Sequence, residues 1–427
     1  MNISPARKGA FDILLRIERE NAYSSFLLPV FEAGLTELDS SLCHELTLGT
    51  LRRQIYLDRL IDVLSKGKKV DIEVRIALRL ALYQLNFLTK IPQYSAINES
   101  VNLVQRARKT SAKGFANAIL RRASREKIDI SYSDGIDRIS VETSHPRWLI
   151  EKWISQFGVE ETAKLGGINN KVPPLAFRFI GQPHDDTQRI VRRSENVETC
   201  FIADSGEARI YELAENGDAY IQDEASQMTA FAVEIPDGGR FLDVCAAPGG
   251  KTGAIALQNK ERTRSIFAGD IHASRVEYLR GNCKRQGAVF VKIVQFDAES
   301  GLPFADGSFD SVLVDAPCSG TGTIRRNPEI RYSIKETDFA ELAAKQLQIL
   351  TNASKLASGG GSIVYSTCSL EVEENEEVCM AFLQENADFE KVIPNVPGKF
   401  HTNSGFARTL PQRDDMDGFF IAAFRRK

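Results

Sequence analysis

The first 126 residues carry apolar side chains at the spacing of amphipathic helices. The four stripes comprise Ala6, Ala10, Ile13, Leu14 and Ile17; Val70, Val74, Ala77, Leu78, Ala81, Leu82 and Leu85; Ile97, Val101 and Val104; and Phe115, Ala118 and Ile119. Ser4 followed by Pro5 is typical of a helix start, because proline fits the first helical position. Short polar breaks separate the stripes, so the pattern predicts an all-helical bundle with the stripes as its core.

Residues 127–235 mix two kinds of pattern. Residues 144–149 open a predicted helix that ends near Gly166 and Gly167, and a turn follows at 169–174. Residues 175–180 are rich in β-favouring side chains and predict a strand, whereas 185–194 fit a helix. We expect a connector and a small α+β subdomain here.

From residue 236 onward, short apolar strands alternate with helical segments. The predicted strands are 241–245, 265–270, 289–296, 311–314 and 362–365, and the predicted helices are 252–258, 273–286 and 338–357. This alternation favours a parallel sheet with helices on both faces. We therefore expect a multidomain chain with an all-α bundle at 1–126, a small α+β subdomain at 127–235 and a Rossmann-like α/β domain at 236–427.

Charge divides the chain unevenly. Residues 1–126 have a net charge of +7, whereas the remainder has a net charge of −10. A basic first unit favours a nucleic-acid partner, and a solvated helical surface is the alternative.

Several classes of protein are not expected. No apolar run reaches the roughly 18 residues of a membrane span, and residues 1–10 lack the apolar core of a secretory signal. The seven cysteines include no Cys-x-x-Cys pair, and the five histidines are scattered without metal-ligand spacing. We expect a cytoplasmic protein with no bound metal and no membrane partner, and a monomer is the simplest state.

A glycine-containing loop at residues 243–252 reads Asp-Val-Cys-Ala-Ala-Pro-Gly-Gly-Lys-Thr. It leaves a predicted strand and enters a helix, whose N-terminus offers free N–H donors to a ligand. Asp270 ends the next strand, 20 residues after Gly250, where an acid that binds ribose is expected. Asp297 ends the third strand and can meet an adenine edge. The pattern predicts a nucleotide-type cofactor site, although Gly-x-Gly-x-x-Gly and the leading glycine of a P-loop are missing. A turn without a ligand is the alternative.

Two cysteines follow later strand ends. Cys318 lies in Asp-Ala-Pro-Cys-Ser-Gly-Thr-Gly at 315–322, and Cys368 lies in Ser-Thr-Cys-Ser at 366–369. Because parallel strands end at one edge of a sheet, both thiols should face the cofactor site. Two thiols beside such a site suggest covalent chemistry on an electron-poor ring. The alternative, packing as small hydrophobes, is the expectation for the other cysteines: Cys43, Cys200, Cys245, Cys283 and Cys379.

The N-terminal segment resembles the NusB-like RNA-binding domain. The matching stretches are Arg-Leu-Ala-Leu-Tyr-Gln-Leu at 79–85, Ile-Pro at 91–92, Ala-Ile-Asn-Glu-Ser-Val at 96–101 and Phe-Ala-Asn-Ala-Ile-Leu-Arg-Arg at 115–122. The resemblance implies an RNA-binding role for this part of the chain.

The C-terminal half resembles RNA cytosine-5 methyltransferases of the Nop2/Sun family through the 243–252 loop, Asp270, Asp297 and both cysteine motifs. With a NusB-like domain in front, the order of domains is similar to the RsmB/Sun (Fmu) branch of bacterial ribosomal RNA methyltransferases. The resemblance implies S-adenosylmethionine as cofactor. It also implies methylation of C5 of one cytosine in 16S (small-subunit) ribosomal RNA, at a site of the cytosine-967 type.

The same resemblance implies residue roles. Cys368 is the nucleophile that adds to C6, and Cys318 assists release as a base. Asp315 faces the N3 edge of cytosine, and Lys251 steadies the target or the developing charge. The implied cofactor-binding residues are Cys245, Ala246, Ala247, Pro248, Gly249, Gly250, Lys251, Asp270, Asp297 and Asp315.

Two charged groups near the cysteines are less specific. Arg325, Arg326 and Arg331 follow the first motif and are candidates for holding RNA phosphates, with a solvated surface as the alternative. The acidic run after Cys368 is interpreted as a charged helix start; it comprises Glu371, Glu373, Glu374, Glu376 and Glu377.

Two other functions are consistent with parts of the pattern. One is an RNA-binding assembly or antitermination factor with a degenerate methyltransferase body, which the intact loop and both cysteines oppose. The other is a DNA cytosine-5 methyltransferase, in which Cys318 would attack and the Thr-Cys motif would have no purpose. The presence of both motifs favours RNA.

Overall fold

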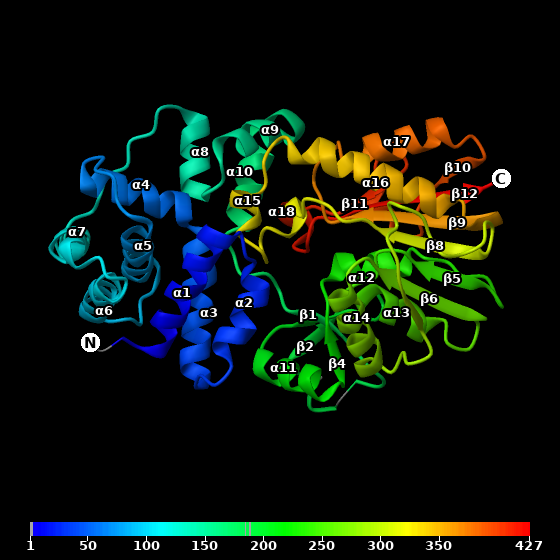
Figure 1. Ribbon diagram of the computed structural model, residues 1–427, viewed down its shortest axis with the longest axis horizontal. Coiled ribbons are helices and arrows are strands. Elements are labelled where there is room, and N and C mark those ends of the chain that lie inside the picture. Colours follow the sequence, from blue (N-terminus) through cyan, green and yellow to red (C-terminus); the bar gives the residue numbers. More distant parts are fainter. Residues whose placement is uncertain (1–2, 184, 188) are drawn as a thin grey trace. The chain divides into compact units, whose positions relative to one another are not determined.

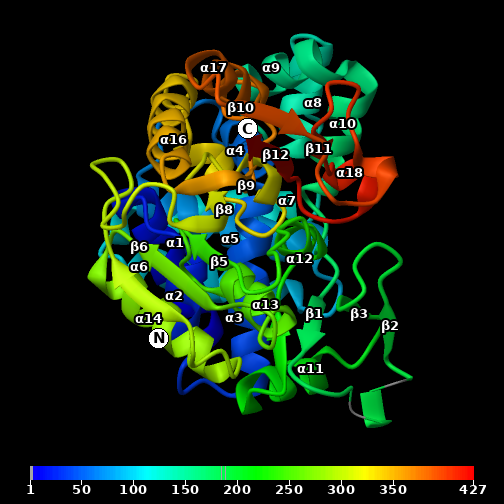
Figure 2. The same ribbon diagram turned by 90° about the vertical axis from the view of Figure 1, so that its right-hand side faces the viewer.

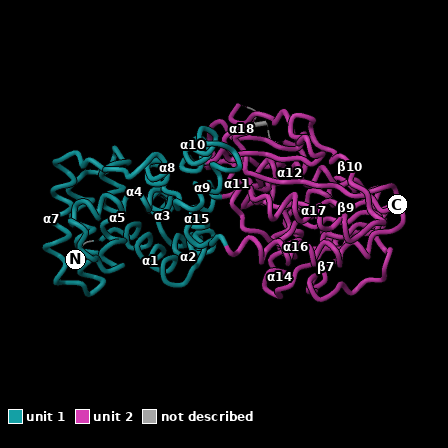
Figure 3. The backbone as a smooth tube through the Cα atoms, turned by 90° about the horizontal axis from the view of Figure 1, so that it is seen from above, with its two compact units in different colours: residues 1–172, 324–336 teal, residues 173–323, 337–427 magenta. Residues whose placement is uncertain are grey.

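The computed structural model describes residues 3–183, 185–187 and 189–427 of the 427-residue chain. His184, one of the scattered histidines, and position 188 of the predicted 185–194 helix therefore lie outside the described residues, as do residues 1–2. The chain forms two compact units (Figure 3). The helical unit comprises residues 1–172 and 324–336, and the sheet unit comprises residues 173–323 and 337–427. The sequence-based division at 126 and 235 stays a prediction, because compactness does not test independent folding.

The helical unit contains the elements that the apolar stripes predict and several more. Its helices are α1 (Pro5–Glu20), α2 (Ser24–Glu32), α3 (Glu37–Arg52), α4 (Gln54–Ser65), α5 (Ile72–Phe87), α6 (Gln93–Arg106), η1 (Thr110–Ala112), α7 (Lys113–Ala123), α8 (Gly135–Thr143), α9 (Arg147–Phe157), α10 (Val159–Ile168) and α15 (Ile330–Ser333). Helix α5 is buried on nearly all sides from Val74 to Gln84, so it forms the centre of the bundle. The all-α prediction for this segment is confirmed.

One helix prediction in this unit is wrong. The single helix expected to run from 144–149 to Gly166 is divided into α9 and α10 at Gly158. Gly158 has φ +82° and ψ 166°, a non-helical conformation with positive φ that glycine adopts readily and that interrupts the helix.

The sheet unit begins with a small antiparallel sheet in the order β2-β3-β1-β4. Its elements are β1 (Ala176–Phe179), η2 (Asp185–Thr187), β2 (Val191–Arg193), β3 (Phe201–Ala203), α11 (Glu207–Asn216) and β4 (Ala219–Ile221). The predicted 185–194 helix is wrong in its second half, because Val191–Arg193 pairs with β3 as a strand, whereas Asp185–Thr187 forms one short 3-10 helix, η2.

The main sheet has the order β10-β12-β9-β8-β5-β6-β7, with β11 paired to β12. Its elements are α12 (Glu224–Phe231), β5 (Arg240–Asp243), α13 (Gly250–Gln258), β6 (Ser265–Asp270), α14 (Ala273–Arg285), β7 (Lys292–Gln295), β8 (Phe309–Asp315), η3 (Thr321–Thr323), α16 (Asp338–Ser354), β9 (Ala357–Thr367), α17 (Glu376–Glu385), β10 (Phe389–Val392), η4 (Gly398–Phe400), β11 (Ala407–Arg408), α18 (Pro411–Asp414) and β12 (Phe420–Arg426).

Strands β5 to β9 pair in parallel, as the alternating pattern predicts. The sheet is nevertheless mixed, because β12 lies antiparallel between β9 and β10.

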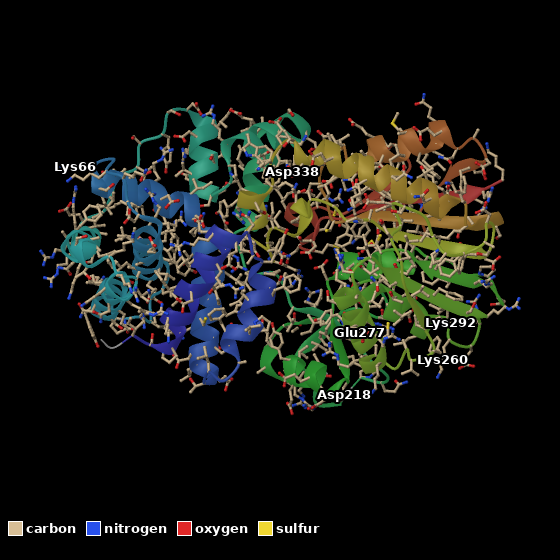
Figure 4. All side chains as sticks on the ribbon, in the orientation of Figure 1. Lys66, Asp218, Lys260, Glu277, Lys292 and Asp338 are labelled. Carbon is tan, nitrogen blue, oxygen red and sulfur yellow. The ribbon has the colours of Figure 1, made fainter. Side chains whose placement is uncertain are left out.

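Helices cover both faces of the main sheet. Figures 1 and 2 show α16 and α17 on one face and α13 and α14 on the other. Successive strand residues enter different cores, since Phe241 packs with α13 and α14 while Leu242 packs with α16 and α17. Many charged side chains lie at the surface, and Lys66 of the helical unit and Lys260 of the sheet unit are exposed examples (Figure 4).

Among the residues that the structure describes, no helix combines the length and the apolar character needed to cross a membrane. The same residues contain no cluster of His, Cys, Asp and Glu side chains that could hold a metal ion.

Candidate active site

The two cysteine motifs meet at the carboxyl ends of neighbouring strands. Strands β8 and β9 pair in parallel with Asp315 opposite Ser366, so the loops that follow them lie side by side. Cys318 and Cys368 are both half-buried, and their Sγ atoms are 3.3 Å apart. Fifty residues of sequence separate these thiols, and the parallel register brings them together.

Asp315 is held from two directions. Lys251 Nζ donates to one carboxylate oxygen at 2.7 Å, and Ser366 Oγ donates to the other at 2.7 Å. The Lys251 ammonium also lies 5.0 Å from the centre of the Phe419 ring, a cation–π arrangement that helps to hold a partly desolvated cation. The predicted Lys251 and Asp315 are therefore a bonded pair. Ser366 lies in the predicted Thr-Cys motif, but the sequence assigned no role to it or to Phe419.

The pKa values of Lys251 and Cys318 are both raised by their surroundings. Burial lowers the pKa of Lys251, but the charge and hydrogen bond of Asp315, with a contribution from Cys368, raise it above its ordinary value overall. The pKa of Cys318 is raised by its hydrogen bond to Cys368 and by burial. Lys251 thus remains a cation near Cys368, while Cys318 holds its proton.

A cavity of about 270 Å³ opens beside the thiols. Its walls include both cysteines, Cys318 and Cys368, and three of the predicted acids, Asp270, Asp297 and Asp315. The remaining wall residues are Val244, Cys245, Ala247, Ile271, His272, Arg275, Phe296, Ala298, Glu299, Ala316, Pro317, Lys345 and Ile349. A mixed apolar and acidic wall of this kind suits a ligand with a flat ring and hydroxyl groups.

The acids on the cofactor side are fixed mainly by donors in their own loops, and Asp270 also by the 243–252 loop. Asp270 is buried and accepts hydrogen bonds from the backbone N–H of Ile271 at 2.9 Å and of Ala247 at 3.3 Å. Asp297 accepts from Ser300 Oγ at 2.6 Å and from the Glu299 N–H at 2.9 Å. These bonds lower the pKa of Asp297. Both side chains therefore present ordered oxygens to the cavity.

The predicted loop residues divide between the cavity wall and its support. Cys245 and Ala247 line the cavity, whereas Ala246 and Gly250 are buried. Pro248 borders a neighbouring hollow of about 320 Å³. Gly249 precedes α13 with φ +103°, a conformation that favours glycine.

Side chains from outside the loop hold three of its successive carbonyl groups. Asn282 donates to Pro248 O at 2.7 Å, Gln286 donates to Gly249 O at 3.2 Å, and Arg178 Nη2 lies 3.5 Å from Gly250 O. Burial lowers the pKa of Arg178 to about 10. The sequence did not single out Asn282, Gln286 or Arg178, because nothing in their local pattern identifies a loop that they contact.

Asp243 lies beneath the loop. It is buried and accepts a hydrogen bond from Thr252 Oγ1 at 2.6 Å. Burial raises its pKa to about 7, and the Thr252 hydrogen bond only partly opposes this effect. Burial likewise raises the pKa of the neighbouring Cys245, so that thiol stays protonated and behaves as a packing group.

The arginines that follow Cys318 do not form an exposed phosphate site. Arg331 is 0% exposed and binds the carbonyl oxygens of Thr143, Ser144 and Asn169. Arg325 is 4% exposed and binds Val172 O at 2.9 Å. The sequence-based phosphate role is therefore wrong for both, because buried guanidinium groups satisfied by backbone carbonyls do not reach RNA. Arg326 is half-buried and also has an interaction within the protein.

Comparisons with known proteins agree with this arrangement. The model of the 16S rRNA methyltransferase RsmB/F family matches residues 230–425, and the NusB family model matches residues 4–125. A probable ribosomal RNA small subunit methyltransferase B of Bacillus subtilis (strain 168) is 34% identical over 100% of both chains. The ribosomal RNA small subunit methyltransferase B of Pseudomonas putida is 33% identical over 92% of each chain.

One solved crystal structure shares the fold over 100% of both chains, with a TM-score of 0.84 at 24% identity. The chain therefore belongs to the ribosomal RNA small subunit methyltransferase B family, whose members depend on S-adenosylmethionine.

Proposed function

We propose that this chain methylates C5 of one cytosine in small-subunit ribosomal RNA, at a site of the cytosine-967 type, through a covalent bond between Cys368 and C6. The observation that carries the proposal is a single cavity bordered by two thiols 3.3 Å apart and by the cofactor-side acids. Family membership supports the RNA substrate, since the curated relatives are described as small-subunit ribosomal RNA methyltransferases.

The cavity suits S-adenosylmethionine. Apolar side chains such as Ile271 and Phe296 can flank an adenine ring, while Asp270 can bind ribose hydroxyl groups. A Cβ atom at Gly250 would lie 3.0 Å from Tyr220, so the small residue keeps the start of α13 closely packed. We assign Cys245, Ala247, Asp270 and Asp297 to cofactor contacts, and the rest of the loop to their support.

Cys368 is assigned as the nucleophile. We assign the donor role in the Cys318–Cys368 hydrogen bond to Cys318 and the acceptor role to Cys368. The Lys251 ammonium, whose pKa is raised in part by Cys368, can stabilise the negative charge of an attacking Cys368 sulfur. Addition of the Cys368 thiolate to C6 forms an S–C6 bond, and the C5–C6 π electrons move onto C5 and the ring.

Asp315 and Lys251 stabilise this electron-rich ring. The carboxylate of Asp315 can accept a hydrogen bond from the N3 edge as N3 takes up a proton, and Lys251 supplies a positive charge 2.7 Å from that carboxylate. Because the pair is partly desolvated, its electrostatic effect exceeds that of the same groups in water.

Release completes the reaction. When bound, S-adenosylmethionine supplies the electrophilic methyl group that C5 takes up. C5 then loses its proton, the C5–C6 double bond re-forms and the Cys368–C6 bond breaks, returning the thiolate. We assign assistance in this elimination to Cys318. Its thiol first gives its proton to water, and the resulting thiolate, a strong base because the pKa of Cys318 is raised, takes the C5 proton while N3 returns its proton to water.

The helical unit is the proposed RNA-binding part, acting in a cytoplasmic monomer. The net charge of +7 over residues 1–126 and the exposed cations on and after α7 support this RNA-binding role. Lys113, Arg121 and Arg125 are exposed there, and Arg122 forms an exposed ion pair with Glu126. Cations of this kind bind RNA phosphates without reading their sequence.

Bisulfite mapping of ribosomal RNA tests the reaction. RNA from a strain lacking this chain should lose one methylated cytosine in the small subunit, and the wild-type gene should restore it. Loss of no RNA site, or loss of a DNA site, would overturn the proposal. Calorimetry with S-adenosylmethionine separates an enzyme from an assembly factor with a degenerate body, because the latter should show no binding.

A further inference from the structure

A buried carboxylate lies directly beneath the two cysteine loops. Glu374 is 0% exposed and belongs to the segment between β9 and α17. Its oxygens accept hydrogen bonds from the Ser319 N–H at 2.8 Å, Gln346 Nε2 at 2.9 Å and Ser369 Oγ at 2.6 Å, and also from Ser319 Oγ. Four donors match the acceptor capacity of an ionised carboxylate. This role differs from the helix-start interpretation of the acidic run.

The donors come from both loops. Ser319 directly follows Cys318, and Ser369 directly follows Cys368. The two serine hydroxyls are also 3.1 Å apart. Gln346 adds a further restraint on the first loop, since the same amide donates to Pro317 O, one residue before Cys318. One carboxylate therefore joins the residues that flank both thiols.

Two other residues of the acidic run lie elsewhere. Glu376 is half-buried and pairs with Arg408 at 2.7 Å, and Glu377 is exposed on the first turn of α17. These two side chains fit the helix-start interpretation. Glu374 instead points to the cysteine loops, and Tyr365 Oη donates to its backbone carbonyl at 2.7 Å. The backbone and the side chain of Glu374 are thus both fixed.

We propose that Glu374 is a positioning residue that sets the distance between the Cys318 and Cys368 thiols, and so couples attack to release. The proposal rests on the function proposed above for these thiols. Displacing either loop by about 1 Å should cost roughly 100-fold in rate, because catalytic groups tolerate little misplacement. The negative charge of Glu374 also contributes to the raised pKa of Cys318, after the hydrogen bond to Cys368, burial and the charge of Cys368.

The first test measures the thiol distance without RNA. Treating the free protein with diamide oxidises two thiols to one disulfide, while diamide is reduced to the hydrazine. Mass spectrometry of the Cys318–Cys368 crosslink should show rapid formation in the wild type and at least tenfold slower formation in Glu374→Ala. Glu376→Gln is the matched control on the same acidic run and should crosslink at the wild-type rate.

The second test uses RNA and S-adenosylmethionine. Glu374→Ala should lower kcat about 100-fold, leave KM for RNA within threefold, and accumulate a covalent RNA–protein adduct because release slows more than attack. Glu374→Gln can turn its amide nitrogen toward the two serine hydroxyls, so it should fold. Its loss of charge should move the alkylation profile of Cys318 to lower pH, which a purely structural role would not do.

Failure of the positioning role and failure of the proposed function give different results. If Glu374→Ala does not fold, Ser369→Ala removes one of the four donors and should give a smaller effect in the same direction. Wild-type crosslinking, kcat and adduct levels in both Ser369→Ala and Glu374→Gln, with an unmoved alkylation profile, would overturn the inference. A wild-type enzyme that crosslinks rapidly but methylates no cytosine would instead overturn the proposed function and leave the positioning claim standing.

Discussion

The two ends of the cavity are built by different kinds of contact. At the cofactor end, formed by the 243–252 loop, Asp270 and Asp297, each acid is fixed largely by neighbours in sequence, as when Asp270 accepts from the next N–H. At the thiol end, formed by Cys318 and Cys368, key fixing contacts join the loops after two different strands, as between Ser319 and Glu374, which are 55 positions apart. The acids of the cofactor end are therefore held largely from within their own loops, although the 243–252 loop also depends on Arg178, Asn282 and Gln286 from outside it. The thiol end depends more on contacts between the two strand ends.

This difference predicts how each end responds to substitution. Changes at the cofactor end should alter ligand affinity and leave the chemistry of the bound state largely intact. Changes at the thiol end should alter the chemistry and leave cofactor affinity intact, because the two sets of bonds share few residues.

Cys368→Ala should give the largest difference between an effect on the chemistry and an effect on cofactor affinity. Without the nucleophile no covalent bond to C6 can form, so methyl transfer should fall by at least ~10³-fold. The dissociation constant of S-adenosylmethionine, measured by calorimetry, should stay within threefold of wild type. Methylation at the wild-type rate would remove Cys368 from the role assigned to it.

Cys318→Ala tests the other thiol. Attack should persist while elimination slows, so a covalent RNA–protein adduct should accumulate and migrate as a retarded band on a denaturing gel. The double variant Cys318→Ala with Cys368→Ala is the control and should give no band. If the single variant turns over without any adduct, release does not depend on Cys318.

Asp243→Asn tests the buried acid at the cofactor end. The pKa of Asp243 is about 7 in the folded protein and about 3.9 in an unfolded chain. The folded state therefore binds the proton more tightly, and the stability contributed by protonation is lost as the pH rises toward 7. Between pH 5.5 and 8 the free energy of unfolding of the wild type should fall by about 2 kcal/mol relative to that of Asp243→Asn.

Urea unfolding at the two pH values measures this difference. Asparagine does not titrate, so the stability of the Asp243→Asn variant should depend less on pH. Its side-chain oxygen can still accept the hydrogen bond from Thr252. Asp237→Asn, at a side chain that is 79% exposed, should follow the wild-type profile. Parallel profiles for wild type and Asp243→Asn would show that Asp243 does not titrate in this range.

The smallest expected effect is that of Asn282→Ala. This change removes the donor to Pro248 O, and one lost hydrogen bond of about 1 kcal/mol corresponds to a roughly fivefold weaker cofactor affinity. The kcat at saturating cofactor should not change. A lower kcat with unchanged affinity would show that the loop serves the thiol end as well.

Local sequence signals explain what could be predicted. Strand β6 has the bounds that the apolar pattern gives, Ser265–Asp270. The loop, the acids and the cysteines could be identified from the sequence because each motif lies at a strand end. The helix break at Gly158 could not be predicted, because the residues of α9 and α10 on either side of it both have helical patterns. The three-residue strand at Val191–Arg193 is too short for a clear alternation.

Non-local contacts explain what was missed. The charge of Arg325 and Arg331 suggested RNA, but charge does not reveal that a side chain turns inward to backbone carbonyls. Glu374 stood among four other acids, and only the folded chain distinguishes it from Glu377. The antiparallel insertion of β12 depends on a partner, β9, that ends more than fifty residues earlier.

The placement of Arg331 has a consequence for protein synthesis. Arg331 binds carbonyl groups at Thr143, Ser144 and Asn169, yet it belongs to the 324–336 segment, which is translated after most of the strands of the sheet unit. A ribosome that has released the first 172 residues has not yet made the donor for those carbonyls. The helical unit is therefore completed late in translation, and no single proteolytic cut can release it whole.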